Sequence, residues 1–178
     1  MKTYLAITSR EGFPQEEMSY KENSYPLKGS HLLRVGRWSF PGNCYFVTAS
    51  TLNRLPILTD PTCCEIVFDS IEWLEKEKKI ECYCCIIMPD HIHLVMKLGP
   101  EQTLSQVMQS LKGYTASEIN KLKGKKGHVW QDQYYDHLIR KEKDMRNIIL
   151  YCYENPVRRN IVQEANGYPF WRCKFAIE

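Results

Sequence analysis

Two histidines separated by one residue, His91 and His93, are the residues of this 178-residue chain best suited to chemistry. They follow Pro89-Asp90 within residues 80–98, a segment that predicts two β-strands joined by a tight turn. Side chains alternate across a strand, so both imidazoles share one face, with the residues about 7 Å apart along the strand. Two such imidazoles can converge on one divalent cation. A purely structural pair is the alternative.

The opposite face of the same strand is wholly apolar. Its side chains are those of Ile92, Leu94, Met96 and Leu98. One face therefore suits a hydrophobic core, and we expect the histidines on the other face.

Composition narrows the class of protein. The chain carries 24 basic and 21 acidic residues, and a net charge of +3 does not by itself indicate a nucleic-acid partner. Its length suits one domain with a sizeable core. No signal pattern or long apolar run occurs, so we expect a cytoplasmic protein without a membrane partner.

Eight cysteines raise the question of zinc or disulfides. Two adjacent pairs, Cys63-Cys64 and Cys84-Cys85, and the strand context of Cys82 favour buried apolar thiols instead. A structural zinc site built on residues 82, 84 and 85 is the alternative.

The elements before and after the histidine hairpin can be predicted from local signals. Residues 44–52 are rich in β-branched and aromatic side chains and predict the first strand. Asp60-Pro61 has the form of a helix start, with aspartate as N-cap and proline in the first turn. Thr103 and Gln106 form a capping box that predicts a second helix.

The C-terminal part of the chain predicts a further strand and helix. His128–Arg140 is rich in aromatic and branched residues and predicts the fourth strand. Asp144 is the N-cap or a first-turn acid of the last helix, which ends near Asn155 because Pro156 disfavours helical geometry there.

The order strand, helix, strand, strand, helix, strand is that of the ferredoxin-like split βαβ fold. We therefore predict an α+β domain over 37–178, with an antiparallel four-stranded sheet and two helices on one face. His91 and His93 would lie on the other, open face, which the additional C-terminal helix can cross. Residues 1–36 lack a sustained period and predict an irregular extension.

Tyr151 lies off the apolar side of the last helix, and Asn155 lies one turn further along the same side. Tyr153, in contrast, lies near the apolar side and is expected to pack. Tyr151 is therefore a candidate for a functional hydroxyl, with an ordinary surface tyrosine as the alternative.

Basic residues gather in two places after the second helix. Glycines interrupt a lysine-rich segment at 121–127, which predicts a flexible loop, and a basic, aromatic tail follows the last helix. We expect phosphate contacts from both places, and a simply solvated loop is the alternative. The residues concerned are Lys121, Lys123, Lys125, Lys126, Arg158 and Arg159.

Three segments together resemble single-tyrosine transposases. Met-Pro-Asp-His-Ile-His-Leu-Val at 88–95 is similar to their HUH motif, a His-apolar-His triplet. Residues 129–140 and 151–162 are similar to downstream blocks of one branch, the REP-associated tyrosine transposases, relatives of the transposases of small insertion sequences. The resemblance covers roughly residues 34–172.

The resemblance implies a transposase with endonuclease and strand-transfer activity on hairpin-bearing single-stranded DNA of a repeat element. It implies that His91 and His93 hold Mg²⁺ or Mn²⁺, and that Asn155 occupies the position of a third, polar ligand. Tyr151 would be the nucleophile that forms a 5′-phosphotyrosine. Relatives of this kind act as monomers or homodimers, so either state is expected.

Two other classes of protein fit part of the pattern. A non-catalytic module could bind single-stranded nucleic acid through aromatic residues of the open sheet face, such as Trp130, Tyr134 and Tyr135. A histidine-triad nucleotide hydrolase would need a third histidine where Val95 stands. Metal dependence separates the first alternative from a transposase.

Overall fold

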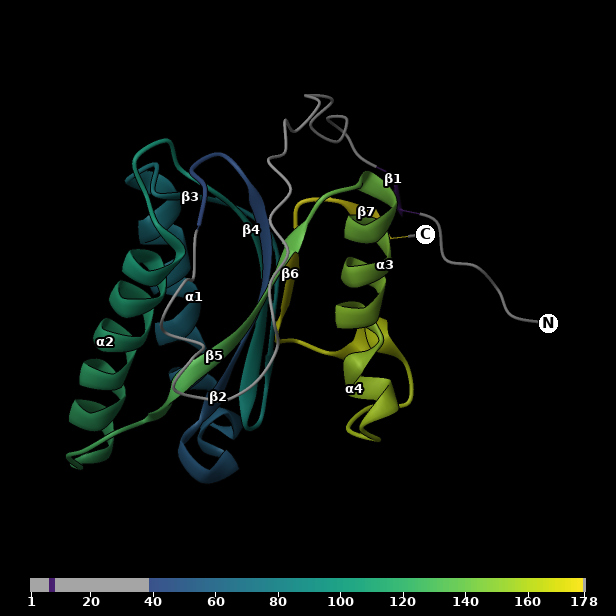
Figure 1. Cartoon of the computed structure of the whole chain (residues 1–178). Coiled ribbons are helices and arrows are strands. Elements are labelled where there is room, and N and C mark those ends of the chain that lie inside the picture. The colour runs from purple at the N-terminus through teal and green to yellow at the C-terminus, as the bar shows by residue number, and fades with distance from the viewer. Residues whose placement is uncertain (1–6, 9–38, 178) are drawn as a thin grey trace.

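The computed structural model describes residues 7–8 and 39–177, in which a twisted sheet lies between two layers of helices (Figure 1). Helices α1 and α2 cover one face, and α3 and α4 cover the other. The predicted irregular extension over 1–36 lies outside the described residues except for β1 (Ile7–Thr8), which pairs with β7 (Ala176–Ile177). Across the described ranges, no helix combines the length and apolar character needed to cross a membrane.

The large sheet is antiparallel, with strand order β5-β2-β4-β3-β6. Its first four strands confirm the predicted split βαβ arrangement. The short β6 pairs with β3, with Cys173 opposite Cys84, and adds a fifth strand that was not predicted. Three residues are too few to show an alternating pattern. The strands are β2 (Cys44–Thr51), β3 (Ile80–Met88), β4 (His91–Leu98), β5 (Trp130–Ile139) and β6 (Trp171–Cys173).

Helices α1 (Pro61–Lys76) and α2 (Leu104–Lys123) begin where their capping residues predict. The Asp60 carboxylate accepts a hydrogen bond of 2.9 Å from the Thr62 backbone N–H. The capping box of Thr103 and Gln106 is complete, and Gly124 ends α2 with a left-handed φ of +60°. Both ends of α2 are thus fixed by local chemistry.

The two faces of β4 are both buried, but in different cores. The predicted apolar face, Ile92 to Leu98 in alternation, packs with α1 and α2. Val95, on the histidine face, belongs to a second core with Met145, Ile149 and Cys152 of α3. The histidine face is therefore not open, because the apolar side of α3 needs a partner and the sheet provides it.

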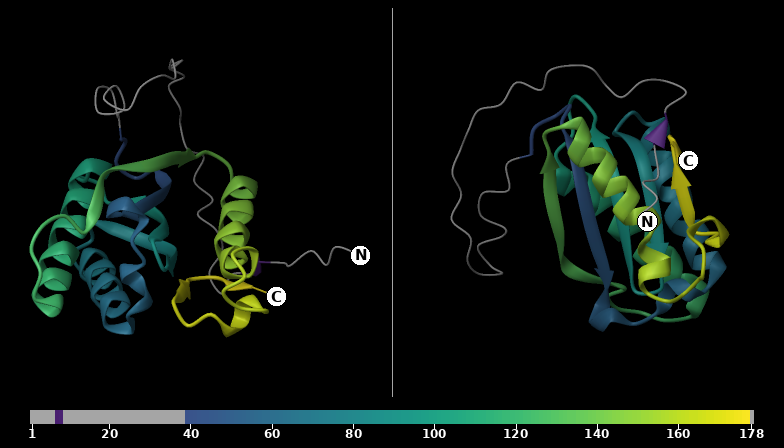
Figure 2. Two further views of the ribbon diagram at one scale, coloured as in Figure 1. Left: turned by 90° about the horizontal axis from the view of Figure 1, so that it is seen from below. Right: turned by 90° about the vertical axis from the view of Figure 1, so that its right-hand side faces the viewer.

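Helix α3 (Glu142–Tyr153) runs along the histidine face, on the side of the sheet opposite α1 and α2 (Figure 2). Lys141 is its N-cap, and Asp144 lies in the first turn, as one of the two predicted positions. The helix ends at Tyr153, and after Glu154 the one-turn helix α4 (Asn155–Arg158) follows. Three short 3₁₀ turns complete the described elements: η1 (Leu52–Arg54), η2 (Ile57–Thr59) and η3 (Ala165–Gly167).

Candidate active site

The imidazoles of His91 and His93 converge beneath α3. Their Nε2 atoms are 3.2 Å apart and their ring centroids 4.7 Å, so the rings lean toward each other from neighbouring positions on one strand face. Both residues are almost fully buried, with 3% and 5% of their surface exposed. The pair forms a polar site inside an otherwise apolar layer.

The Asp90 carboxylate contacts the nitrogen of the His91 ring that does not face His93. Its Oδ1 lies 2.5 Å from His91 Nδ1, and its Oδ2 accepts a hydrogen bond of 3.3 Å from Arg54. An ionised carboxylate can only accept, so His91 Nδ1–H is the donor. In a neutral His91 the Nε2 atom then carries the lone pair, and it faces His93.

The Thr48 hydroxyl fixes the ring of His93. Strand β2 places Thr48 directly opposite His93, and Oγ1 lies 2.8 Å from Nδ1. A hydroxyl can donate or accept, so His93 is free to take either tautomer. With Nε2 protonated, His93 donates to His91; with Nδ1 protonated, it donates to Thr48 and presents a second lone pair beside that of His91.

Burial lowers the pKa of both histidines. The pKa of His93 falls from its ordinary value of 6.5 to about 3, chiefly through burial and then through the charges of His91, Arg158, Arg54 and Arg159. For His91, burial outweighs the hydrogen bond to Asp90, which acts in the opposite direction. Both rings are therefore neutral near pH 7, the form that coordinates metal ions.

The geometry of the pair fits a divalent cation. A separation of 3.2 Å is that of two adjacent nitrogen ligands each about 2.1 Å from one ion. Within residues 7–8 and 39–177, no cluster of three His, Cys, Asp or Glu side chains could hold a metal, so an ion would need other donors as well. Asn155 is buried at the start of α4, directly after α3. Its service as the third ligand stays a prediction.

Tyr151 of α3 lies against the histidine pair. Its ring centroid is 5.7 Å from that of His93 and 6.3 Å from that of Phe46, edge to face in both cases. The residue is nevertheless 47% exposed, so a substrate can reach it. Tyr153 instead packs on Trp171, with centroids 5.6 Å apart. The structure thus brings Tyr151, and not Tyr153, to the histidines; its role as nucleophile stays a prediction.

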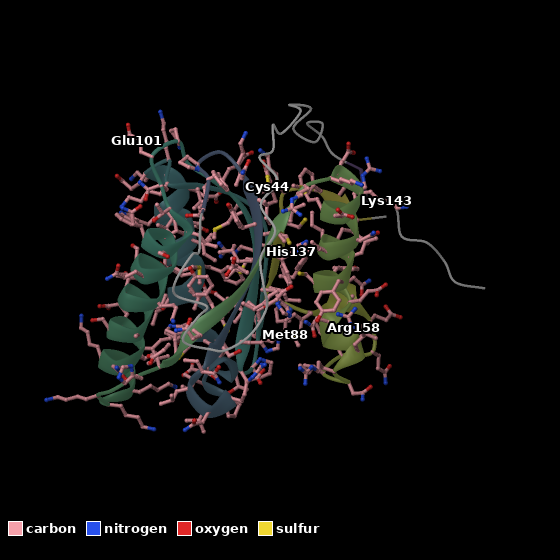
Figure 3. All side chains as sticks on the ribbon, viewed as in Figure 1. Cys44, Met88, Glu101, His137, Lys143 and Arg158 are labelled. Atoms are coloured by element: carbon pink, nitrogen blue, oxygen red, sulfur yellow. The ribbon has the colours of Figure 1, made fainter. Side chains whose placement is uncertain are left out.

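Arg158 reaches back from α4 to Tyr151, at the end of the molecule that also holds Met88 (Figure 3). Its guanidinium carbon lies 4.1 Å from the centroid of the tyrosine ring. Together with Arg54 and Arg159, its charge contributes to the lowered pKa of His93. These arginines give the surroundings of the histidine pair a positive field, which suits a phosphate group.

The four lysines that were predicted to contact phosphates lie away from the histidine pair. Lys123 pairs with Asp60 and Lys121 with Glu118, whereas Lys125 and Lys126 are exposed after the end of α2. Helix α2 covers the sheet face opposite α3, so these lysines do not surround the histidine pair (Figure 2).

The lysine segment nevertheless lies at the same end of the sheet as the histidines. Val129, which closely follows the lysine segment, accepts a backbone hydrogen bond of 2.8 Å from Leu52. The neighbouring Thr51 donates one of 2.9 Å to Asp90, the residue before His91. A long nucleic acid could therefore touch both places.

The aromatic residues of β5 divide between the two faces. Trp130 is buried and donates a 2.9 Å hydrogen bond to Thr115 of α2, and Tyr134 packs against the α1–α2 core. Tyr135 is 59% exposed and lies on the histidine face, 6.2 Å from Phe46. Of these three candidates for base stacking, Tyr135 alone has both the exposure and the right face.

The cysteines behave as predicted. All eight are free thiols; six are buried and two partly buried. They serve as small apolar residues in the two cores.

Three supporting residues of the site were not predicted: Asp90, Thr48 and Arg54. A carboxylate next to a candidate ligand histidine is a recurrent second partner of metal-binding imidazoles, so Asp90 could have been found from its position alone. Thr48 and Arg54 depend on the pairing of β2 with β4, which local patterns do not reveal.

Comparison with known proteins finds a matching family model and named relatives. The family model described as IS200-like transposase matches residues 43–154. A REP-associated tyrosine transposase of Escherichia coli is 26% identical over 136 residues, which are 75% of this chain and 78% of that protein. A Haemophilus influenzae protein provisionally given the same name is 33% identical over 95 residues, 47% of this chain and 53% of that protein.

A solved structure shares the fold. It is that of a REP-associated tyrosine transposase bound to a REP hairpin, and it matches with a TM-score of 0.64 at 24% identity. The match covers 76% of this chain and 79% of that one.

Proposed function

The chain belongs to the IS200-like family of transposases, and on that basis we propose that it cleaves and rejoins single-stranded DNA beside a hairpin. The observation that carries this proposal is the exposed Tyr151 ring against His93, whose Nε2 faces that of His91. A phosphotyrosine mechanism needs a tyrosine hydroxyl as nucleophile and a metal ion on the phosphate, and the two histidine nitrogens beside Tyr151 can bind such an ion. The relative bound to a REP hairpin supports hairpin-bearing repeat DNA as the partner.

We propose Mg²⁺ or Mn²⁺ as the cofactor, held by His91, His93 and Asn155. When bound, such an ion neutralises charge on the non-bridging oxygens of the scissile phosphate. Two neutral imidazoles alone bind Mg²⁺ weakly, so substrate phosphate is expected to complete the site. Asp90 directs the Nε2 lone pair of His91 toward His93. Thr48 orients the His93 ring, and when Nδ1 of His93 is protonated its Nε2 lone pair faces the same point.

The reaction would begin with attack of the Tyr151 hydroxyl oxygen on phosphorus. The new bond joins the tyrosine oxygen to phosphorus, and the bond from phosphorus to the 3′ oxygen breaks. The phenolic proton is lost to solvent, and the departing 3′ oxygen takes up a proton. The phosphotyrosine keeps the energy of the broken bond, so attack by another 3′-hydroxyl can reseal the strand without ATP.

Charged and aromatic residues near Tyr151, together with lysines farther along the same end of the sheet, would hold the strand. We propose phosphate contacts for Arg159 and for the lysine segment at the end of α2, in which Lys125 and Lys126 follow the helix and are exposed. Tyr135 offers an exposed ring on the histidine face for stacking an unpaired base.

The exposed ring of Tyr135 also supports the alternative of a binding module without catalysis. One experiment separates the two functions. Hairpin oligonucleotides with randomised single-stranded flanks, labelled at the 3′ end, are incubated with the protein in Mn²⁺ or in EDTA and run on a denaturing gel. A transposase gives a covalent protein–DNA band in Mn²⁺ only; a binding module retains the DNA on a native gel in both conditions and gives no covalent band.

A further inference from the structure

Arg158 makes two contacts with Tyr151 and one with Glu154. Its guanidinium carbon lies 4.1 Å from the ring centroid, and its Nη2 donates a 2.6 Å hydrogen bond to the Tyr151 backbone carbonyl. Its Nη1 lies 3.5 Å from the carboxylate of Glu154. The same guanidinium therefore holds both the ring and the backbone of one residue.

The break between α3 and α4 makes this geometry possible. The Tyr151 carbonyl belongs to the last turn of α3, where carbonyl groups lack the partners that a continuing helix would supply. Asn155, whose N–H would reach this carbonyl in a continuing helix, instead begins α4, and α4 returns the Arg158 side chain to this end. Arg158 thereby caps α3 and stacks on its tyrosine at once.

The surroundings of the ring show what this contact achieves. His93 and Phe46 meet the ring edge to face and leave 47% of the residue exposed. A half-exposed tyrosine with two edge contacts can change rotamer unless another group holds it. The guanidinium is that group, because it is planar, stacks on the ring and has further N–H groups to anchor it.

We propose that Arg158 is a positioning residue that holds the Tyr151 ring against the histidine pair for attack on the phosphate. The proposal rests on the proposed function, and it gives Arg158 a task other than the phosphate contact predicted from the sequence. A phosphate contact needs only positive charge, which lysine also provides. Stacking and two simultaneous hydrogen bonds need the planar fork of arginine.

Arg158→Lys distinguishes the two tasks because it keeps the charge and removes the fork. Arg146→Lys is the matched control, since Arg146 pairs with Glu142 at the opposite end of α3 with the same four-residue spacing. Arg158 is exposed, so both variants should fold, which the melting temperature checks.

The rate of adduct formation is measured in single turnover with saturating 3′-labelled hairpin DNA and Mn²⁺, and the DNA Kd by fluorescence anisotropy. We expect Arg158→Lys to slow adduct formation roughly tenfold with Kd changed less than about twofold, because a misplaced ring reduces attack and not binding. Arg146→Lys should match the wild type in both. An unchanged rate, or a loss that appears wholly in Kd, overturns the proposal.

A second readout does not depend on catalysis. In protein labelled with fluorotyrosine, the fluorine NMR signal of Tyr151 is assigned by its absence in Tyr151→Phe. We expect its chemical shift to change in Arg158→Lys but not in Arg146→Lys. A signal that stays in place overturns the contact itself. If the wild type forms no adduct but the signal moves, the proposed function fails while the contact between Arg158 and Tyr151 is supported.

Discussion

Acidification should destabilise the metal-free protein through His93. This imidazole is 5% exposed, and burial is the largest cause that lowers its pKa from 6.5 to about 3. Between these values the unfolded chain binds a proton that the folded chain excludes. The free energy of unfolding is therefore highest above pH 6.5 and falls as the pH drops toward 3.

The size of the effect follows from the difference in proton affinity. At pH 5 the imidazole of the unfolded chain, with a pKa of 6.5, is almost fully protonated, and the folded one is almost fully neutral. Because pH 5 lies one and a half units below the pKa of the imidazole in the unfolded chain, the free energy of unfolding is lower by about 2 kcal/mol. This is a large part of the 5–15 kcal/mol that is roughly typical of a domain.

Urea unfolding in EDTA at pH 7 and pH 5 measures the loss. His93→Gln keeps a polar side chain for the Thr48 hydroxyl and removes the titrating group, so its stability should fall by about 2 kcal/mol less than that of the wild type over this interval. His137→Gln, at an exposed position on β5, is the matched control and should follow the wild type (Figure 3). Equal losses in wild type and His93→Gln would refute a buried, neutral imidazole.

Two further predictions concern the metal and the DNA. Asp90→Asn should weaken Mn²⁺ binding about tenfold to a hundredfold in calorimetry, because the amide no longer fixes the tautomer of His91; an affinity equal to that of the wild type would contradict this role. Neutralising the lysines at and beyond the C-terminal end of α2 should reduce the slope of log Kd for hairpin DNA against log salt, whereas an unchanged slope would show that the segment is merely solvated. The variant for this test combines Lys123→Gln, Lys125→Gln and Lys126→Gln.

Local signals predicted most of the framework correctly. Alternation along β4 assigned the histidines and the apolar residues to opposite faces, and the caps at Asp60 and Thr103 gave the starts of α1 and α2. Helical spacing separated Tyr151 from Tyr153. These signals succeed because each depends on residues within one turn or one strand.

Features that depend on contacts between distant segments were not predictable in the same way. The pairing of β2 with β4 brings Thr48 to His93, and no periodicity in either strand encodes that register. The last helix was expected to cross an open histidine face, but the extent of its packing was not predicted: the α3 side chains Met145, Ile149 and Cys152 form a second core with this face and bury it. The return of Arg158 to Tyr151 likewise depends on the turn between α3 and α4.

Attack of Tyr151 on the DNA would leave a covalent protein–DNA adduct, which a denaturing gel detects. Wild type, Tyr151→Phe and Tyr153→Phe are incubated with 3′-labelled hairpin DNA and Mn²⁺, and the products are separated on a denaturing gel. We predict an adduct for the wild type and Tyr153→Phe and none for Tyr151→Phe, with DNA affinity within about twofold of the wild type because only the attacking oxygen is lost. An adduct that persists in Tyr151→Phe would place the nucleophile elsewhere and contradict the proposed site.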